Sequence, residues 1–208
     1  VYPTTYTLSG DLSFKGLYTP TYGTTLFDLT FGSHKMALSG SVMEGGNSCT
    51  TEYRGGAWTA NFQAHQWSNR NKAQSTFNAT EFSGKWFEFF VRSRNSTVTL
   101  TNAATLVSDY DSGNRAVIFD FENFASATNN LLEIRNGSSL TLKRKQVAVD
   151  HGGMATSDWY NNRILVSGVG SRLVNEGVTA PFCIGLDHGG NSITLEDGAE
   201  LSTYQFTI

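Results

Sequence analysis

The sequence has few of the residues and patterns that identify most classes of protein. Its 208 residues include two cysteines and three prolines, and only 16% are charged, for a net charge of -3. So low a charge argues against nucleic acid or an anionic membrane surface as the main partner. No run of about 18 apolar residues is present, so we expect no membrane insertion. The chain opens at Val1 without a basic leader, which suggests a processed or excised segment.

Recognisable catalytic patterns are also missing. The sequence has four histidines and no GxSxG, HExxH or P-loop motif, so we predict neither an enzyme nor a cofactor. Cys49 and Cys183 lie far apart and form no CxxC pair, which argues against zinc and thioredoxin-like chemistry. Two alternatives stay open for them: one long-range disulfide in an oxidising compartment, or two thiols.

The residues that are abundant point to an all-β protein. There are 21 glycines, 14 phenylalanines and 8 tyrosines, with frequent Ser, Thr and Asn, which is typical of short strands joined by tight turns. A chain of this length buries roughly 70% of its unfolded surface in one body. We therefore expect a single domain over 1–208, with 1–84 less regular than 85–208.

The second half of the sequence contains four copies of one repeat unit, which consists of a strand, a turn of small residues and a leucine. Its strands contain Val98, Leu132, Ile164 and Ile193, and its leucines are Leu106, Leu140, Leu173 and Leu201. Successive copies start 34, 32 and 29 residues apart, and a further apolar strand lies between them. Phe87 to Leu100 also aligns without gaps on Phe182 to Leu195.

A repeat with fixed strands and variable loops indicates stacked coils, each adding one strand to every face. We predict a right-handed parallel β-helix of about six coils, roughly 30 Å long at the usual strand spacing. The alternative is an antiparallel β-sandwich. The turns Asn102-Ala103, Asn136-Gly137, Gly168-Val169-Gly170 and Asp197-Gly198 have residue types that tolerate a left-handed backbone, as a corner requires.

Some of these segments also resemble a known family. The runs Gly168 to Leu173, Ile184-Gly185-Leu186 and Asn191 to Ala199 resemble repeats in the passenger regions of autotransporter-like bacterial surface proteins. The resemblance implies a secreted right-handed β-helix that presents surfaces or spans distance. This chain departs from the family in being richer in Phe and Trp.

Two Asp-His-Gly-Gly turns are the first candidate for chemistry. Asp150 and His151, and likewise Asp187 and His188, each precede a Gly-Gly pair. If they lie on adjacent coils, they form either a cation site or an acid/base pair acting on a glycan. The interpretation that we favour is structural, with each Asp accepting backbone N–H bonds at its own turn. We therefore predict no metal.

Trp159 and Tyr160 are the second candidate, because they lie in a long loop. Exposed aromatic rings stack on sugars, although loop aromatics more often cover a solenoid. We predict a secreted or cell-surface protein with a structural or adhesive role. We predict one of two partners. The first is a second copy of the chain, joined end to end through a strand such as Val1 to Leu8, and the second is a surface glycan. The alternative is a carbohydrate-binding or carbohydrate-active β-helix of polysaccharide lyase or glycoside hydrolase type.

Overall fold

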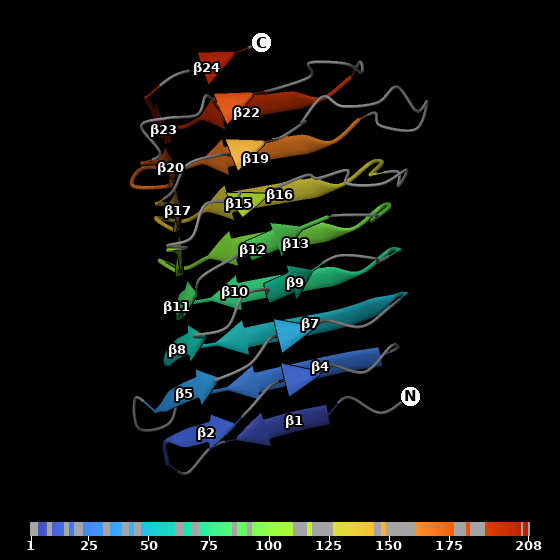
Figure 1. The fold of residues 1–208 in the computed structure, drawn as a ribbon, viewed down its shortest axis with the longest axis vertical. Helices are drawn as coiled ribbons and strands as arrows, with labels where there is room; N and C mark the ends of the chain where they lie inside the picture. The colour runs from blue at the N-terminus through green and yellow to red at the C-terminus, as the bar shows by residue number, and fades with distance from the viewer. Residues whose placement is uncertain are drawn as a thin grey trace.

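The chain winds into stacked coils, as the computed structural model shows (Figure 1). The structure describes residues 4–7, 10–14, 17–18, 23–30, 34–38, 42–43, 47–60, 65–67, 71–84, 87–90, 93–109, 116–117, 127–143, 147–148, 161–176, 182–183, 190–204 and 206–207. Their strands form three sheets of eight, and each coil contributes one strand to each sheet. Among the described residues, no helix is long and apolar enough to span a membrane.

Coil 1 contains β1, β2 and β3, and each later coil takes the next three strands, up to β22, β23 and β24 in coil 8. The first sheet, sheet A, contains β1 (Thr4–Thr7), β4 (Gly23–Asp28), β7 (Cys49–Arg54), β10 (Gln74–Asn78), β13 (Thr97–Thr101), β16 (Leu131–Arg135), β19 (Arg163–Ser167) and β22 (Ser192–Glu196). Sheet B contains β2 (Leu12–Phe14), β5 (Lys35–Leu38), β8 (Ala57–Ala60), β11 (Glu81–Gly84), β14 (Thr105–Ser108), β17 (Ser139–Leu142), β20 (Arg172–Asn175) and β23 (Glu200–Thr203). Sheet C contains β3 (Leu17–Tyr18), β6 (Val42–Met43), β9 (His65–Trp67), β12 (Phe87–Phe89), β15 (Ala116–Val117), β18 (Val147–Ala148), β21 (Phe182–Cys183) and β24 (Phe206–Thr207).

The pairing of the repeats is the one that the sequence predicts. In sheet A, Leu132 pairs with Val98 on one side and Ile164 on the other, and Ile164 pairs in turn with Ile193. The repeated leucines pair in the same way in sheet B. Every described strand pair is parallel, so the parallel β-helix is confirmed and the antiparallel sandwich is wrong.

The number of coils is eight, so the prediction of about six is wrong. The reason is that the early coils are shorter. Ala73 and Ser96, which occupy the same corner in successive coils, are 23 residues apart, whereas Ser96 and Asn130 are 34 apart. The extra residues lie between sheet B and the next strand of sheet A, as between β14 and β16. Eight strands at about 4.8 Å spacing give a stack of roughly 34 Å.

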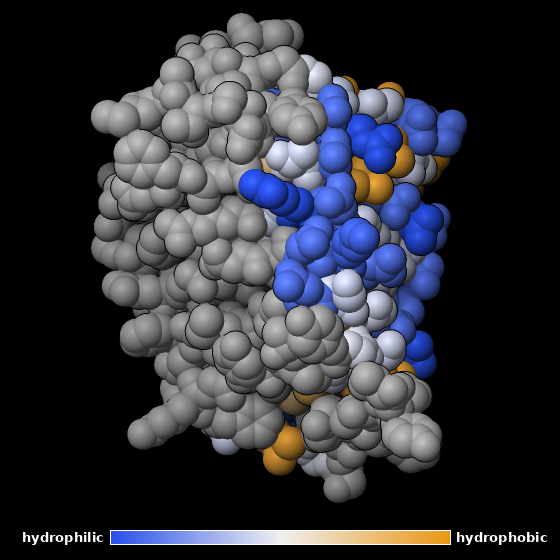
Figure 2. Space-filling view, turned by 90° about the vertical axis from the view of Figure 1, so that its right-hand side faces the viewer, coloured by the Kyte–Doolittle hydropathy of each residue, from blue (hydrophilic) through white to orange (hydrophobic). Residues whose placement is uncertain are grey.

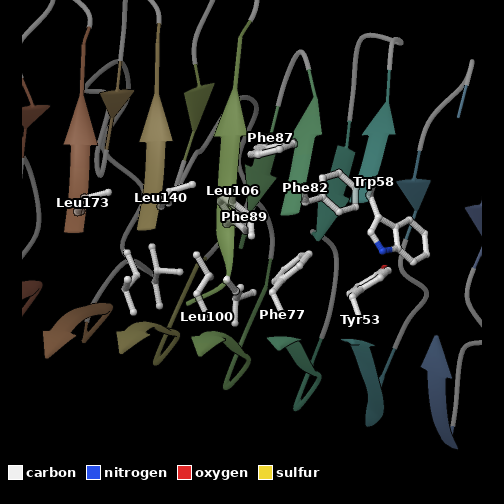
Figure 3. Packing of buried hydrophobic residues seen from close by; sticks show 14 of the residues in the cluster. Tyr53, Trp58, Phe77, Phe82, Phe87, Phe89, Leu100, Leu106, Leu140 and Leu173 are labelled. Carbon is white, nitrogen blue, oxygen red and sulfur yellow. The ribbon is translucent and has the colours of Figure 1, made fainter. Parts of the chain in front are cut away.

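The interior is packed with aromatic rings at one end and aliphatic side chains at the other (Figure 3). Tyr53 stacks between Phe27 and Phe77, with ring centroids 5.5 and 4.9 Å away. In the later coils the same position holds Leu100 and then Ile134, and both are fully buried. One hydrophobic core therefore runs from coil 2 to coil 8.

Small polar residues accompany the aromatic rings. Thr25, Thr51 and Ser75 face inward beside Phe27, Tyr53 and Phe77, and all three are buried. In later coils this position holds Val98 and Leu132, beside aliphatic neighbours. A small side chain beside a large ring and two aliphatic side chains of intermediate size have similar total volumes. Both combinations can therefore fill a close-packed interior.

Candidate functional site

The corner that precedes sheet A repeats one backbone conformation in coil after coil. In six successive coils, the residue at one equivalent position shortly before the sheet A strand has a positive φ. These residues are Ser48 (56°), Lys72 (57°), Asn95 (52°), Asn129 (55°), Asn161 (60°) and Gly190 (82°). Asn and Gly adopt this conformation at the least cost, which explains their frequency here. All six residues are exposed. The corner therefore presents a column of exposed, mostly polar residues (Figure 2).

The residue that follows each member of this column points inward and is polar in most coils. These residues form a second column, and hydrogen bonds along it link neighbouring coils. The backbone N–H of Ser96 donates to Oδ1 of Asn130 at 3.0 Å, and that of Asn130 donates to Oδ1 of Asn162 at 3.1 Å. The Asn162 N–H continues the chain to Oδ1 of Asn191 at 3.0 Å. Because Asn130 and Asn162 are buried, each bond replaces one that water would otherwise make.

The outer column has side-chain contacts of its own. Nδ2 of Asn95 donates to Oδ1 of Asn71 at 3.3 Å, and Nδ2 of Asn129 donates to Oδ1 of Asn95 at 3.2 Å. Beyond Asn129 the column opens into a groove of about 300 Å³, lined among the described residues by Asn129, Asn161, Arg163 and Gly190. This groove is a candidate binding site.

Arg163 supplies the only charge among the described residues that line the groove. It is exposed at the start of β19, on the outer face of sheet A. Its backbone N–H donates to the carbonyl of Asn130, but within the described part of the chain its guanidinium has neither an ion pair nor a hydrogen bond. By contrast, Arg135 and Arg172 contact Glu133 and Glu200 at 3.4 and 3.2 Å.

A charged cluster lies on the same face of sheet A in coils 2 to 4. Arg54 contacts both oxygens of Glu52 at 2.9 Å and lies 3.6 Å from Asp28, and Asn78 donates to Glu52 at 2.8 Å. Burial raises the pKa of Glu52, but the bonds from Arg54 and Asn78 outweigh it and leave this pKa below its usual value. The hydrogen bonds from Thr30 lower the pKa of Asp28.

The hydrogen bond to Glu52 in turn raises the pKa of Arg54. The carboxylates of Asp28 and Glu52 are thus held ionised and already hydrogen-bonded. This suits a structural role between coils and not a proton donor.

The predicted Asp-His site lies outside the described residues, as do its members Asp150, His151, Asp187 and His188, and the aromatic pair Trp159 and Tyr160. Of the turn that contains Asp187 and His188, only Gly190 is described, and its φ of 82° fits a tight turn. Within the described ranges, no group of three or more His, Cys, Asp or Glu side chains is placed to hold a metal.

Cys49 and Cys183 are held far apart by the fold. Cys49 lies in the third coil and Cys183 in the seventh. Four strand spacings of about 4.8 Å separate the two coils by about 19 Å along the axis. The Cα atoms of a disulfide lie within about 7 Å of each other. The separation is incompatible with a disulfide between them in one chain, and the Cys49 side chain is buried.

The asparagine column and the groove were not predicted, although the sequence contains a signal for them. Asn130, Asn162 and Asn191 each stand immediately before a strand of the repeat, at the same offset from the residues that pair. An alignment that included the residue before each strand would have found the column. The arginine next to it, Arg163, occurs in one coil only and leaves no repeat signal.

Together, the three parallel sheets, the filled interior and the asparagine-fastened corner define a parallel β-solenoid. No protein-family model matches the chain, and neither a curated protein sequence nor a solved structure matches it.

Proposed function

We propose that this chain is a structural β-solenoid that lengthens by end-to-end association of its copies. The observation that supports this proposal is the exposure of Leu195 in the last coil. Leu195 faces inward at the position held by Ile134 and Val166 in the preceding coils. Those two residues are fully buried, whereas the exposed fraction of Leu195 is 45%. Covering such a side chain with another coil contributes about 1.5–3 kcal/mol when burial is complete.

The exposed large hydrophobic residues of the described chain gather at its two ends. Tyr204 and Phe206 accompany Leu195 in the last coil, and Leu12 is 40% exposed in the first. Val169, at a corner, is the one member of this described set that lies in neither end coil. Strands at a sheet end also have unpaired N–H and C=O groups that accept another strand.

A second copy is the partner that fits both ends. Its first coil has the same three-sheet cross-section as the last coil, so β1, β2 and β3 of one copy would extend the sheets that end in β22, β23 and β24 of another. Contact between two different surfaces of identical chains is head to tail, and it produces an open filament unless the ring closes.

Concentration-dependent light scattering with two matched variants tests the proposal. Leu195→Lys places a charge on the end surface, and Val169→Lys places the same charge on the most exposed hydrophobic residue away from the ends. We expect the mass of the native chain and of Val169→Lys to rise with concentration, and Leu195→Lys to stay monomeric. A native chain that is monomeric at all concentrations, or equal association of both variants, would contradict the proposal.

We further propose that the solenoid acts outside the cell or on its surface, in a structural or adhesive role. The support is the resemblance to passenger repeats together with a parallel solenoid fold. Antibody labelling of intact cells of the producing organism tests the location. The second candidate function, carbohydrate binding, is favoured by the polar groove beside Arg163.

A further inference from the structure

We infer that the groove at the corner before sheet A binds a carboxylate-bearing sugar, such as a uronic acid unit of an acidic polysaccharide. The groove lies beside coils 6 to 8, where the outer column passes through Asn129, Asn161 and Gly190. Its volume of about 300 Å³ is at the lower end of the range for small-molecule sites.

The charge of the ligand follows from Arg163. A planar guanidinium matches the two oxygens of a carboxylate, and this one has no side-chain partner to displace among the described residues. Arg163 is the only charged residue among those described around the groove, so these described residues balance one negative charge. This favours a carboxylate over a phosphate monoester, which carries nearly two charges at neutral pH.

The hydroxyl-rich character of the ligand follows from the amides. A side-chain amide both donates and accepts hydrogen bonds, as a sugar hydroxyl does. The side-chain amide of Asn161 has no hydrogen-bond partner among the described residues, so it is available to a ligand. Asn129 already uses Nδ2 to bind Asn95, which leaves its oxygen as the group on offer.

Gly190 keeps the groove open. A Cβ atom at this position would lie 2.5 Å from Oδ1 of Asn161, closer than real contacts allow. Any other residue there would push the Asn161 amide aside, and the φ of 82° would itself be strained. Arg163 therefore supplies a positive charge, Asn161 supplies an amide, and Gly190 leaves the space that a ligand needs.

The test measures binding of trigalacturonate to the 208-residue protein by titration calorimetry, with its neutral methyl ester as the comparison. We expect Arg163→Gln to weaken trigalacturonate binding at least about tenfold, since a bond to a charged group contributes about 1.5–3 kcal/mol. The native protein should bind the methyl ester more weakly by a similar factor.

Two further variants separate binding from folding. Asn161→Gly removes the amide and retains the backbone conformation, because glycine adopts the φ of 60° freely. We expect it to weaken binding while circular dichroism stays unchanged. Arg172→Gln is the control, since Arg172 lies on another sheet and pairs with Glu200. Its affinity should equal that of the native protein.

Several results would overturn the inference: no binding by the native protein, equal binding of the acid and its methyl ester, or equal affinity of Arg163→Gln and the native chain. Displacement of trigalacturonate by inorganic phosphate at lower concentration than by acetate would overturn the choice of a carboxylate. The inference does not depend on end-to-end association, because the titration can be repeated in the Leu195→Lys variant, which is expected to stay monomeric and does not change a described lining residue of the groove.

Discussion

Asn162 accepts two hydrogen bonds from Asn130 on one oxygen, from the backbone N–H at 3.1 Å and from the side-chain amide at 3.0 Å. Asn162 also donates its own amide to the carbonyl of Ala127 at 2.8 Å. A single buried side chain thus satisfies groups in the coil before it and holds the corner closed.

Replacing Asn162 should therefore destabilise the protein strongly. In Asn162→Ala, the backbone N–H of Asn130 and the Ala127 carbonyl lose these bonds, while the Asn130 amide keeps its bond to the Ser93 carbonyl. Each buried unsatisfied group costs about 1–3 kcal/mol. We expect a loss of roughly 2–5 kcal/mol in the free energy of unfolding. Urea denaturation measures it.

The control for this prediction is Asn71→Ala, which removes an exposed amide that accepts a hydrogen bond from Asn95 of the outer column. A surface substitution of this kind changes stability by no more than about 0.5 kcal/mol. If the two variants lost the same stability, the buried column would not be what fastens the corner.

The second half of the fold was predictable because its inward positions are aliphatic. Val98, Leu132 and Ile164 are each followed two positions later by a second buried aliphatic residue, and this period-two pattern sets their pairing. The first half uses Thr51 and Ser75 at the equivalent inward position, so the apolar alternation disappears even though both are buried. The repeat is therefore hard to recognise in the first half of the sequence.

The candidate site was harder to predict, because a hydrogen bond between coils leaves no hydropathy pattern. Asn129 and Asn130 are adjacent and chemically identical, yet one lies on the surface and the other is buried. Only the backbone conformation distinguishes them, since Asn129 has a φ of 55°.

The corner between sheets A and B should differ from coil to coil in its tolerance of a methyl group. A Cβ at Gly56 would lie 2.5 Å from Cβ of Leu29 and 2.7 Å from the carbonyl oxygen of His34, whereas a Cβ at Gly137 has no heavy atom nearer than 4.0 Å. Both glycines have a positive φ, so both alanine variants carry the same backbone cost of about 1–2 kcal/mol.

We expect Gly56→Ala to lose at least about 2 kcal/mol more than Gly137→Ala, because overpacking adds about 1–3 kcal/mol to the backbone cost. Thermal unfolding of the two variants checks the difference. Equal losses would show that the chain relaxes around Gly56 without cost.

The hydrogen bonds from Arg54 and Asn78 to Glu52 should make the stability of the protein depend on pH in the acid range. The pKa of Glu52 is lower in the folded protein than its ordinary value of 4.5, so its contribution is fully present above that pH. As the pH falls below about 4.5 and through the lower folded value, the folded protein must take up a proton and stability falls.

Thermal midpoints measured from neutral to acid pH test this dependence. Glu52→Gln should be less stable than the native chain near neutral pH and should lose less stability on acidification. Glu81→Gln, an exposed residue of β11, should follow the native curve. Parallel curves for Glu52→Gln and the native chain would mean that Glu52 is not held in its ionised form.

Amide hydrogen exchange at low and high protein concentration tests most directly the central claim, that the end coils are the surfaces through which copies join. We predict that β22 and β1 become protected as concentration rises, because their free edges acquire a partner strand, while β13 in the middle of sheet A exchanges at the same rate throughout. Association that leaves β22 and β1 unchanged, or that protects the outer corners instead, would contradict the account.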